Sequence, residues 1–208
     1  MLKTNVSSKD INVIIAHYDE DLSWTNNLRL PFCIVSKNKI PDGCIPNKGK
    51  EASSYLEYII KNYNSLTDVS IFIHGHRDSW HSSRIDKYLN GKNIFPLDYY
   101  NINLVSSPRN KQKLQFIPEE SYYFLEKNKH IIEKEINQKI NIPEIQFRPA
   151  ACFYVKKDVI LKHSIEVYKN LFNWIMTTDE SSAISSRVFE YCWHIIFTGK
   201  HIDNYLEY

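Results

Sequence analysis

The sequence has little net charge, no long apolar run and few glycines. Its formal net charge is only +2, from 26 basic and 24 acidic residues. That balance argues against a non-specific nucleic-acid binder, because such a protein needs a concentrated basic face. No segment approaches the roughly 18 consecutive apolar residues of a membrane-spanning helix. With only 5 glycines, the chain is also poorly suited to a fold of many strands joined by glycine-rich turns.

The four cysteines lack the spacing of a metal-binding or redox motif. Cys33, Cys44, Cys152 and Cys192 contain no Cys-x-x-Cys pair, and all but Cys44 have apolar neighbours. This usage is typical of buried free thiols in a reducing compartment. The first ten residues are polar and do not resemble a signal peptide. We therefore expect a soluble, cytoplasmic protein.

Apolar periodicity predicts an α/β fold within one domain of residues 1–208. A chain of this length is natural for a single domain. Short apolar runs predict strands, and apolar residues spaced by three and four positions predict helices. The predicted strands cover residues 11–16, 31–35, 69–73 and 150–155, and the predicted helices cover residues 51–63, 119–138, 165–176 and 185–197. Strands and helices in this order favour a sheet flanked by helices.

The richest chemical signal follows the strand at 69–73. Three histidines and an aspartate lie within eight residues, at positions 74, 76, 78 and 81. If the backbone stays extended, His74, His76 and Asp78 point to one face. Imidazole and carboxylate ligands suit Zn²⁺, Mn²⁺ or Mg²⁺. The segment predicts either a divalent-metal site or a strand end whose histidines cap backbone groups.

The last predicted helix carries a polar stripe on an otherwise apolar surface. Arg187, Glu190 and His194 lie within roughly 60° of one another at 100° per residue. A helix that is apolar on its other sides should be buried, so these groups need partners. The stripe indicates either an internal Arg–Glu ion pair or one edge of an active site.

A third, weaker signal lies before the helix at 51–63. Asn47 and Gly49 provide a turn, and Glu51 then begins the helix. Backbone N–H groups at such a helix start can bind an anion. An ordinary turn with a glutamate favoured by the helix dipole accounts for the same residues.

Four segments together resemble a known family. Residues 17–24, 46–60, 71–81 and 186–197 resemble, in the same order, family 3431 of the domains of unknown function. The first segment is also similar to the strand-to-loop segment of several glycosyltransferases. The second is similar to rhamnan-synthesis-type transferases. The layout as a whole is similar to GT-A-type glycosyltransferases, including a virus-encoded sugar transferase domain.

The GT-A resemblance implies a Rossmann-like domain with a central mixed, mostly parallel sheet flanked by helices. It implies transfer of a sugar from a nucleotide-diphosphate donor, such as a UDP-sugar, to a glycan or other hydroxyl acceptor. GT-A enzymes hold Mn²⁺ or Mg²⁺ with an Asp-x-Asp motif at a strand end. The matching residues here are His76, Arg77 and Asp78, so a histidine replaces the first acid.

The resemblance and the helix stripe together assign roles to individual residues. The metal ligands would be Asp78, His76 and His194. The nucleotide-sugar donor would contact His17, Tyr18, Asp19, Trp24, Asn47, Gly49, Glu51, His76 and Arg77. The catalytic groups would be Glu190, Asp179 and Arg187, with Glu180 as a further candidate base. An inverting transferase needs such a carboxylate to accept the proton of the acceptor hydroxyl.

Two other functions compete with the transferase. A metallo-β-lactamase-like hydrolase would use His-x-His-x-Asp-His, but Ser79 occupies the sixth position and His81 comes two residues late. The low glycine content also disfavours that fold. A non-catalytic sugar-nucleotide-binding module is the second alternative, because His76 replaces an acid of the motif.

Overall fold

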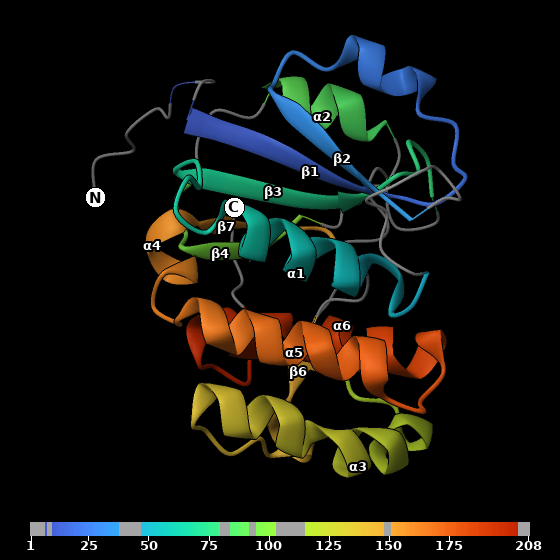
Figure 1. Cartoon of the computed structure of the whole chain (residues 1–208), viewed down its shortest axis with the longest axis vertical. Helices are drawn as coiled ribbons and strands as arrows, with labels where there is room; N and C mark the ends of the chain where they lie inside the picture. Colours follow the sequence, from blue (N-terminus) through green and yellow to red (C-terminus); the bar gives the residue numbers. More distant parts are fainter. Residues whose placement is uncertain are drawn as a thin grey trace.

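A five-stranded mixed sheet forms the centre of the molecule (Figure 1). The computed structural model describes residues 7, 10–37, 47–79, 84–91, 95–102, 115–147 and 151–203. The strands are β1 (Ile11–His17), β2 (Phe32–Ser36), β3 (Val69–His74), β4 (Tyr99–Asn101) and β7 (Phe153–Lys156), in the spatial order β2-β1-β3-β7-β4. The predicted α/β architecture with a mixed sheet is therefore confirmed.

Four of the five strands run in the same direction. β1 pairs in parallel with both β2 and β3, whereas β7 is antiparallel to its neighbours β3 and β4. The chain leaves β1 towards one edge of the sheet and leaves β3 towards the other. The carboxyl ends of β1 and β3 therefore flank a topological switch point, where open α/β sheets place their ligand crevices.

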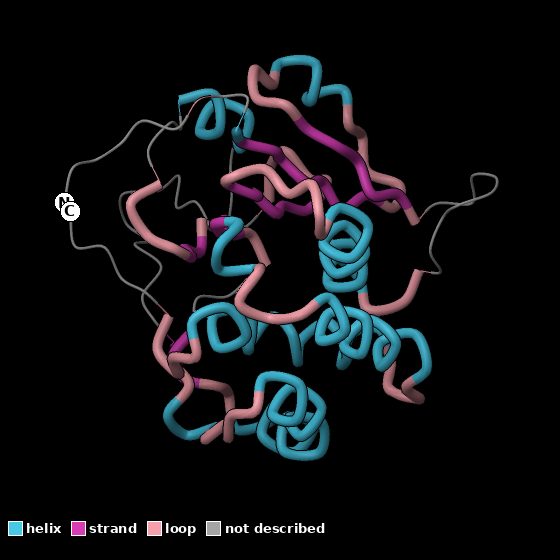
Figure 2. Tube along the Cα trace, turned by 60° about the vertical axis from the view of Figure 1, so that its left-hand side comes forward, coloured by secondary structure: helices cyan, strands magenta, loops and turns pink. Residues whose placement is uncertain are grey.

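Both faces of the central strands β1, β3 and β7 are buried, as the apolar runs in these strands predict. The edge strand β2 is more open, with Phe32 and Ile34 exposed. One face packs against α1 (Lys50–Asn62), followed by α5 (Ile165–Thr177) and α6 (Ser182–Thr198), and then by α3 (Glu119–Ile136). Figures 1 and 2 show these helices in successive layers below the sheet. Alternate strand residues face the other side, where η2 (Ser23–Asn27) and α2 (Ile85–Gly91) cover them.

An aromatic cluster fixes α1 and α6 against the sheet. Tyr55 of α1 lies 5.0 Å from Phe72 of β3 and 5.7 Å from Phe153 of β7, between ring centroids. Trp193 of α6 lies 5.4 Å from Phe153. Buried aromatic pairs of this kind add to the free energy gained from area burial. The cluster also fixes the orientation of α6. Glu190, one turn before Trp193, therefore lies near the carboxyl ends of the parallel strands.

The remaining elements are short. They are β5 (Gln115–Phe116), β6 (Gln146–Phe147), η3 (Ile142–Glu144) and α4 (Lys157–Ile160). β5 and β6 form a separate two-stranded sheet. Such short pieces, like α2 and η2, carry no clear period in the sequence.

Two sequence expectations about local geometry are wrong. β3 ends at His74, so the strand does not continue through Asp78. Helix α6 is not buried all round, because Arg187 is exposed to solvent. Within the predicted stripe, Arg187 is therefore exposed, Glu190 is half-buried and His194 is buried. Gly199 caps the C-terminus of α6 in the left-handed region, with φ of 69°.

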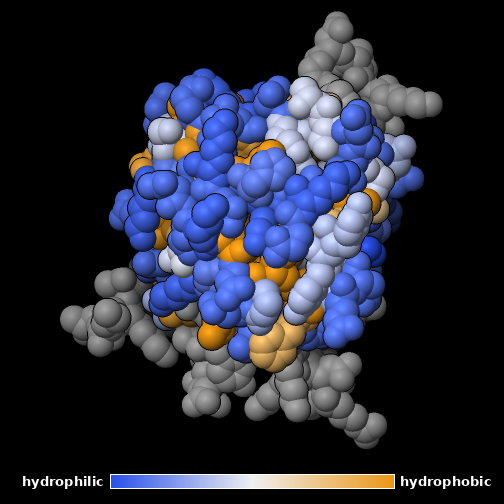
Figure 3. Space-filling view, turned by 90° about the horizontal axis from the view of Figure 1, so that it is seen from below, coloured by the Kyte–Doolittle hydropathy of each residue, from blue (hydrophilic) through white to orange (hydrophobic). Residues whose placement is uncertain are grey.

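The outer face of the helical layers is hydrophilic. Figure 3 views the molecule from below and shows mostly hydrophilic side chains with small apolar areas between them. On α3, Lys127 and Lys129 pair with Glu180 and Glu126, at 2.6 Å and 3.0 Å. Surface pairs like these keep a helix solvated and add little stability. Among the described residues, no helix combines the length and apolar composition needed to cross a bilayer.

Candidate functional site

A cavity of about 470 Å³ opens at the carboxyl ends of the parallel strands. Ala16 and His17 end β1, His74 ends β3, and Lys37 directly follows β2. The start of α1 and Glu190 of α6 form the opposite wall. The full lining is Ala16, His17, Tyr18, Glu20, Lys37, Asn47, Lys50, Glu51, Ser54, His74, His76, Ala151 and Glu190. This volume suits a small organic ligand.

The loop after β1 contributes a firmly held carboxylate. Glu20 Oε2 accepts a hydrogen bond of 2.7 Å from the Tyr18 N–H, and Glu20 Oε1 lies 3.7 Å from His76 Nε2. Partial burial raises the pKa of Glu20, but the Tyr18 hydrogen bond and the nearby His76 and His17 outweigh it and lower the pKa overall. A Cβ on Gly75 would lie 2.9 Å from Glu20 Oε2, so a glycine permits this close approach.

Two lysines line the cavity at the end of β2 and the start of α1. Lys37 is only 7% exposed, and its Nζ donates to the Lys48 carbonyl at 3.3 Å. Burial lowers the pKa of Lys37 to about 8, although Glu51, Glu57 and Glu20 oppose this change. Lys50 is the first residue of α1 and is exposed. The cavity therefore contains one buried and one accessible ammonium group.

Two carboxyl groups from different helices face the same cavity. Glu51 lies in the first turn of α1, and Glu190 lies in α6. Burial raises the pKa of Glu51, and the negative charge of Glu190 raises it further. Two carboxyl groups in one cavity are the residue types that general acid–base chemistry uses.

Cys152 lies near this carboxyl pair but is not a reactive thiol. It is 1% exposed, and burial raises its pKa to about 12. Among the described cysteines, Cys33, Cys152 and Cys192 are all free, as the sequence predicts. Cys44 lies outside the described residues. A buried thiol with a raised pKa packs as a small apolar group and is a poor nucleophile.

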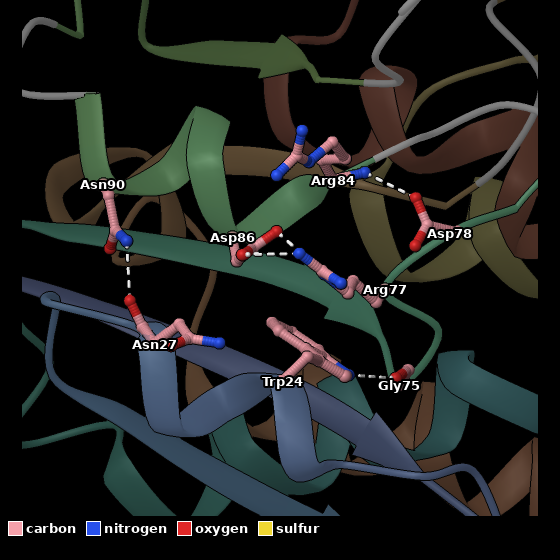
Figure 4. A network of polar contacts seen from close by, with 8 residues as sticks. All are labelled: Trp24, Asn27, Gly75, Arg77, Asp78, Arg84, Asp86 and Asn90. Carbon is pink, nitrogen blue, oxygen red and sulfur yellow. Dashed lines mark hydrogen bonds and ion pairs between the residues drawn. The ribbon is translucent and has the colours of Figure 1, made fainter.

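The residues after β3 mainly stabilise their own loop (Figure 4). Arg77 donates two hydrogen bonds to Asp86 of α2, of 3.2 Å and 3.3 Å. Asp78 accepts a 2.8 Å hydrogen bond from the Arg84 N–H, next to the start of α2. Trp24 is 4% exposed and donates from Nε1 to the Gly75 carbonyl at 2.9 Å.

These residues border a second hollow of about 420 Å³. Its lining is Glu20, Asp21, Ser23, Trp24, Asn27, His76, Arg77 and Asp78. The hollow and the main cavity share Glu20 and His76, so these two residues mark the boundary between them. The surface beyond this boundary is mostly polar and is supplied by the loops that follow β1 and β3.

The structure does not assemble the predicted metal ligands. His194 is 2% exposed, its Nε2 is 3.1 Å from the His201 carbonyl, and it does not line the cavity. Asp78 points to the Arg84 N–H, and His76 lies beside Glu20. Across the described residues, no group of three or more His, Cys, Asp or Glu side chains could hold a metal ion. The residues do not fit the metal that the GT-A resemblance implies.

The other predicted site residues divide into two groups. His17, Tyr18, Asn47, Glu51, His76 and Glu190 line the main cavity. Asp19, Asp179 and Arg187 are exposed and do not line it. Glu180 is bonded to Lys127 and Asn128 of α3, at 2.6 Å and 3.3 Å.

Gly49 supports the cavity wall without lining it. It precedes α1 with φ of 70°, in the left-handed region. A Cβ at this position would overlap the Ile175 Cγ2 atom of α5. The Lys48 Nζ also donates to the Thr178 carbonyl at the end of α5. These contacts hold the start of α1, with Lys50 and Glu51, against α5.

The sequence pattern did not identify Glu20, Lys37, Lys50 or Ser54 as site residues, whereas it did single out His74, as a possible metal ligand. A signal existed for two of the four, because Lys37 directly follows β2 and Glu20 lies in the loop after β1. Ligands gather at those strand ends. Lys50 and Ser54 carry no comparable signal, because they appear as ordinary residues of an amphipathic helix.

Comparison with known proteins identifies a family. The model of a family described as "Protein of unknown function (DUF3431)" matches residues 13–206. That range contains the strands of the central sheet, apart from the first two residues of β1, and the lining of both hollows. No curated protein and no solved structure matches the chain significantly.

Proposed function

The chain belongs to the DUF3431 family of proteins of unknown function, and we propose that it is a glycosyltransferase using a nucleotide-diphosphate sugar, with UDP-sugars as the first candidates. The main supporting observation is the cavity at the switch point, which is lined by ammonium groups and carboxyl groups together. The ammonium groups suit binding of a diphosphate, and the carboxyl groups suit proton transfer from a hydroxyl.

The position and size of the cavity favour a nucleotide-sugar ligand. In open α/β sheets, ligands bind outside the carboxyl ends of the strands at the switch point. Lys37 and Lys50 offer positive charge there, next to the N-terminus of α1. Positive charge at this place stabilises a leaving diphosphate as the sugar–phosphate bond breaks.

The reaction needs one proton acceptor. The acceptor hydroxyl oxygen forms a bond to the anomeric carbon of the sugar. The bond from that carbon to the diphosphate oxygen breaks, and its electron pair leaves with the diphosphate. Glu190 accepts the hydroxyl proton, and the adjoining hollow beyond Glu20 and His76 admits the acceptor. Asp179 and Arg187 take no part, because neither lines the cavity.

We place the fold among the GT-A type as part of the same proposal. Support comes from a mixed sheet with four strands in one direction and from the His-Arg-Asp segment after β3. Since the donor set for a metal is not assembled, no step of this mechanism passes through a divalent cation. The metallo-hydrolase stays an untested alternative, because His81 of its motif lies outside the described residues.

A thermal-shift panel of UDP-, GDP- and dTDP-sugars, with and without Mn²⁺, tests donor binding. A ligand at 100 times its Kd adds about 2.7 kcal/mol of stability, which raises Tm by about 5–11 °C in a domain of this size. We expect at least one nucleotide sugar to give such a shift. Absence of a shift with every nucleotide sugar, under both conditions, would contradict the proposal.

Glu190→Gln separates an enzyme from a binding module. The amide keeps the shape of the side chain but cannot accept the proton, so a general base of this kind should lower turnover by about 10²–10⁴-fold. Donor binding should be retained. Arg187→Gln, one turn earlier on the exposed side of α6, is the matched control and should keep full activity. Donor binding by the wild type without any transfer or hydrolysis would favour the non-catalytic module.

A further inference from the structure

The least expected group in the cavity is a buried lysine. Lys37 is 7% exposed, although an ammonium group loses its hydration when it is buried. Its backbone N–H donates to the His17 carbonyl at 2.9 Å, which continues the β1–β2 ladder by one residue. The main chain therefore fixes the position from which the side chain enters the cavity.

The ammonium group of Lys37 has unused hydrogen-bonding capacity. An ammonium has three N–H donors. Within the described part of the chain, Lys37 donates one hydrogen bond, to the Lys48 carbonyl. Of the carboxylates that favour its charge, Glu57 is paired with Lys61 at 2.7 Å, and Glu20 is bonded to the Tyr18 N–H. The third, Glu51, has the largest effect of the three and lines the same cavity. An anionic ligand in the cavity would take up the remaining donors.

Three of the residues that the GT-A resemblance and the helix stripe assign to the metal or to the donor are engaged elsewhere. Arg77 is paired with Asp86, and Asp78 holds the Arg84 N–H (Figure 4). His194 bonds the His201 carbonyl near the C-terminal end of α6. A fourth, His76, lines the cavity beside Glu20. Lys37, Lys50 and the start of α1 offer positive charge to a diphosphate in the cavity.

We propose that Lys37 and Lys50 bind the diphosphate of the donor directly, so that donor binding does not require a divalent metal ion. This inference rests on the proposed function, because it concerns the same cavity and the same ligand. Lysine is a compact point charge that binds phosphate oxygens without a fixed fork geometry. Lys50 at the first position of α1 adds to the positive end of the helix dipole.

Calorimetric titration of the full chain with UDP tests the inference, in EDTA and in Mn²⁺. Uridine is the matched probe, because it keeps the base and ribose and lacks the diphosphate. We expect UDP to bind in EDTA, with a Kd in Mn²⁺ that differs by less than about threefold. Lys37→Met and Lys50→Met should each weaken UDP binding by about tenfold or more, because each removes a hydrogen bond to a charged group. Uridine binding should change little in either variant.

The control variant is Lys87→Met, which removes an exposed lysine of α2 outside the cavity lining. It should bind UDP like the wild type. Lys50 is exposed, so Lys50→Met remains informative if Lys37→Met folds poorly. UDP binding that requires Mn²⁺ and is unaffected by both lysine variants would overturn this inference and leave the proposed function intact. Absence of binding by UDP and by every nucleotide sugar, in either condition, would overturn both.

Discussion

Replacing Gly49 with alanine should destabilise the fold strongly, because two independent constraints act at this position. The residue has φ of 70°, and a Cβ would overlap the Ile175 Cγ2 atom. The left-handed conformation costs a non-glycine residue about 1–2 kcal/mol. Overpacking a well-filled contact costs about 1–3 kcal/mol more. We expect a total loss of about 3 kcal/mol in unfolding free energy, or about 6–12 °C in Tm.

Urea denaturation and thermal melting measure this loss directly. Gly91→Ala is the matched control, because a Cβ there meets nothing within 4 Å. It lies at the end of α2, where alanine should be neutral or slightly stabilising. In a double-mutant cycle, Ile175→Ala removes the overlapping atom but leaves the strained φ. The double variant should therefore be more stable than the sum of the single changes predicts. A Gly49→Ala protein within about 0.5 kcal/mol of the wild type would refute the argument, and strict additivity would refute its steric part.

Three further changes test other parts of the structure. In Gly75→Ala, the new Cβ would lie 2.9 Å from Glu20 Oε2, which is the mobile end of a side chain. Tm should therefore change little. NMR titration should show the pKa of Glu20 rising towards its usual value. Burial lowers the pKa of His194 to about 4, so between pH 6.5 and 4 the unfolded chain takes up a proton that the folded chain does not. The unfolding free energy should then fall by up to about 3 kcal/mol over that range, and His194→Gln should flatten this part of a denaturation-against-pH curve. Arg77→Gln leaves the Asp86 carboxylate without its guanidinium partner, so the midpoint of urea denaturation should fall below that of the wild type. An equal fall in an Asp86→Asn background would contradict that account.

The longer elements could be predicted from the sequence because their periodicity is strong. The strand at 69–73 and the helix at 165–176 agree with β3 and α5 to within one residue at each end. Both elements place apolar side chains at regular intervals, and the sheet and helical layers bury those side chains. Short elements such as α2, with seven residues, contain too few periods to be recognised. The insertion of β7 between β3 and β4 depends on contacts far apart in sequence, and local pattern carries no information about it.

The site could be predicted in part, both from residue type at strand ends and from polar residues on two helices, Glu51 and Glu190. His17 and His76 follow apolar runs and do line the cavity. Asp78 has the right chemistry for a metal ligand, but its orientation depends on where β3 ends and on the start of α2. His194 shares a helix stripe with Glu190, yet one turn further along α6 it meets the His201 carbonyl instead of the cavity. Helical spacing gives the direction of a side chain, and tertiary packing determines what that side chain meets.

The position of β7 also has a consequence for biosynthesis. β7 carries residues 153–156, and it separates β3 from β4, which precede it by more than fifty residues. A nascent polypeptide that has emerged from the ribosome only as far as β4 therefore cannot complete the sheet, and it leaves the hydrogen-bonding edge of β3 uncovered. Such an edge can pair with another chain. Ribosome-bound chains that have exposed β4 but not yet β7 should accordingly be the species most dependent on chaperones, and emergence of β7 should end that dependence.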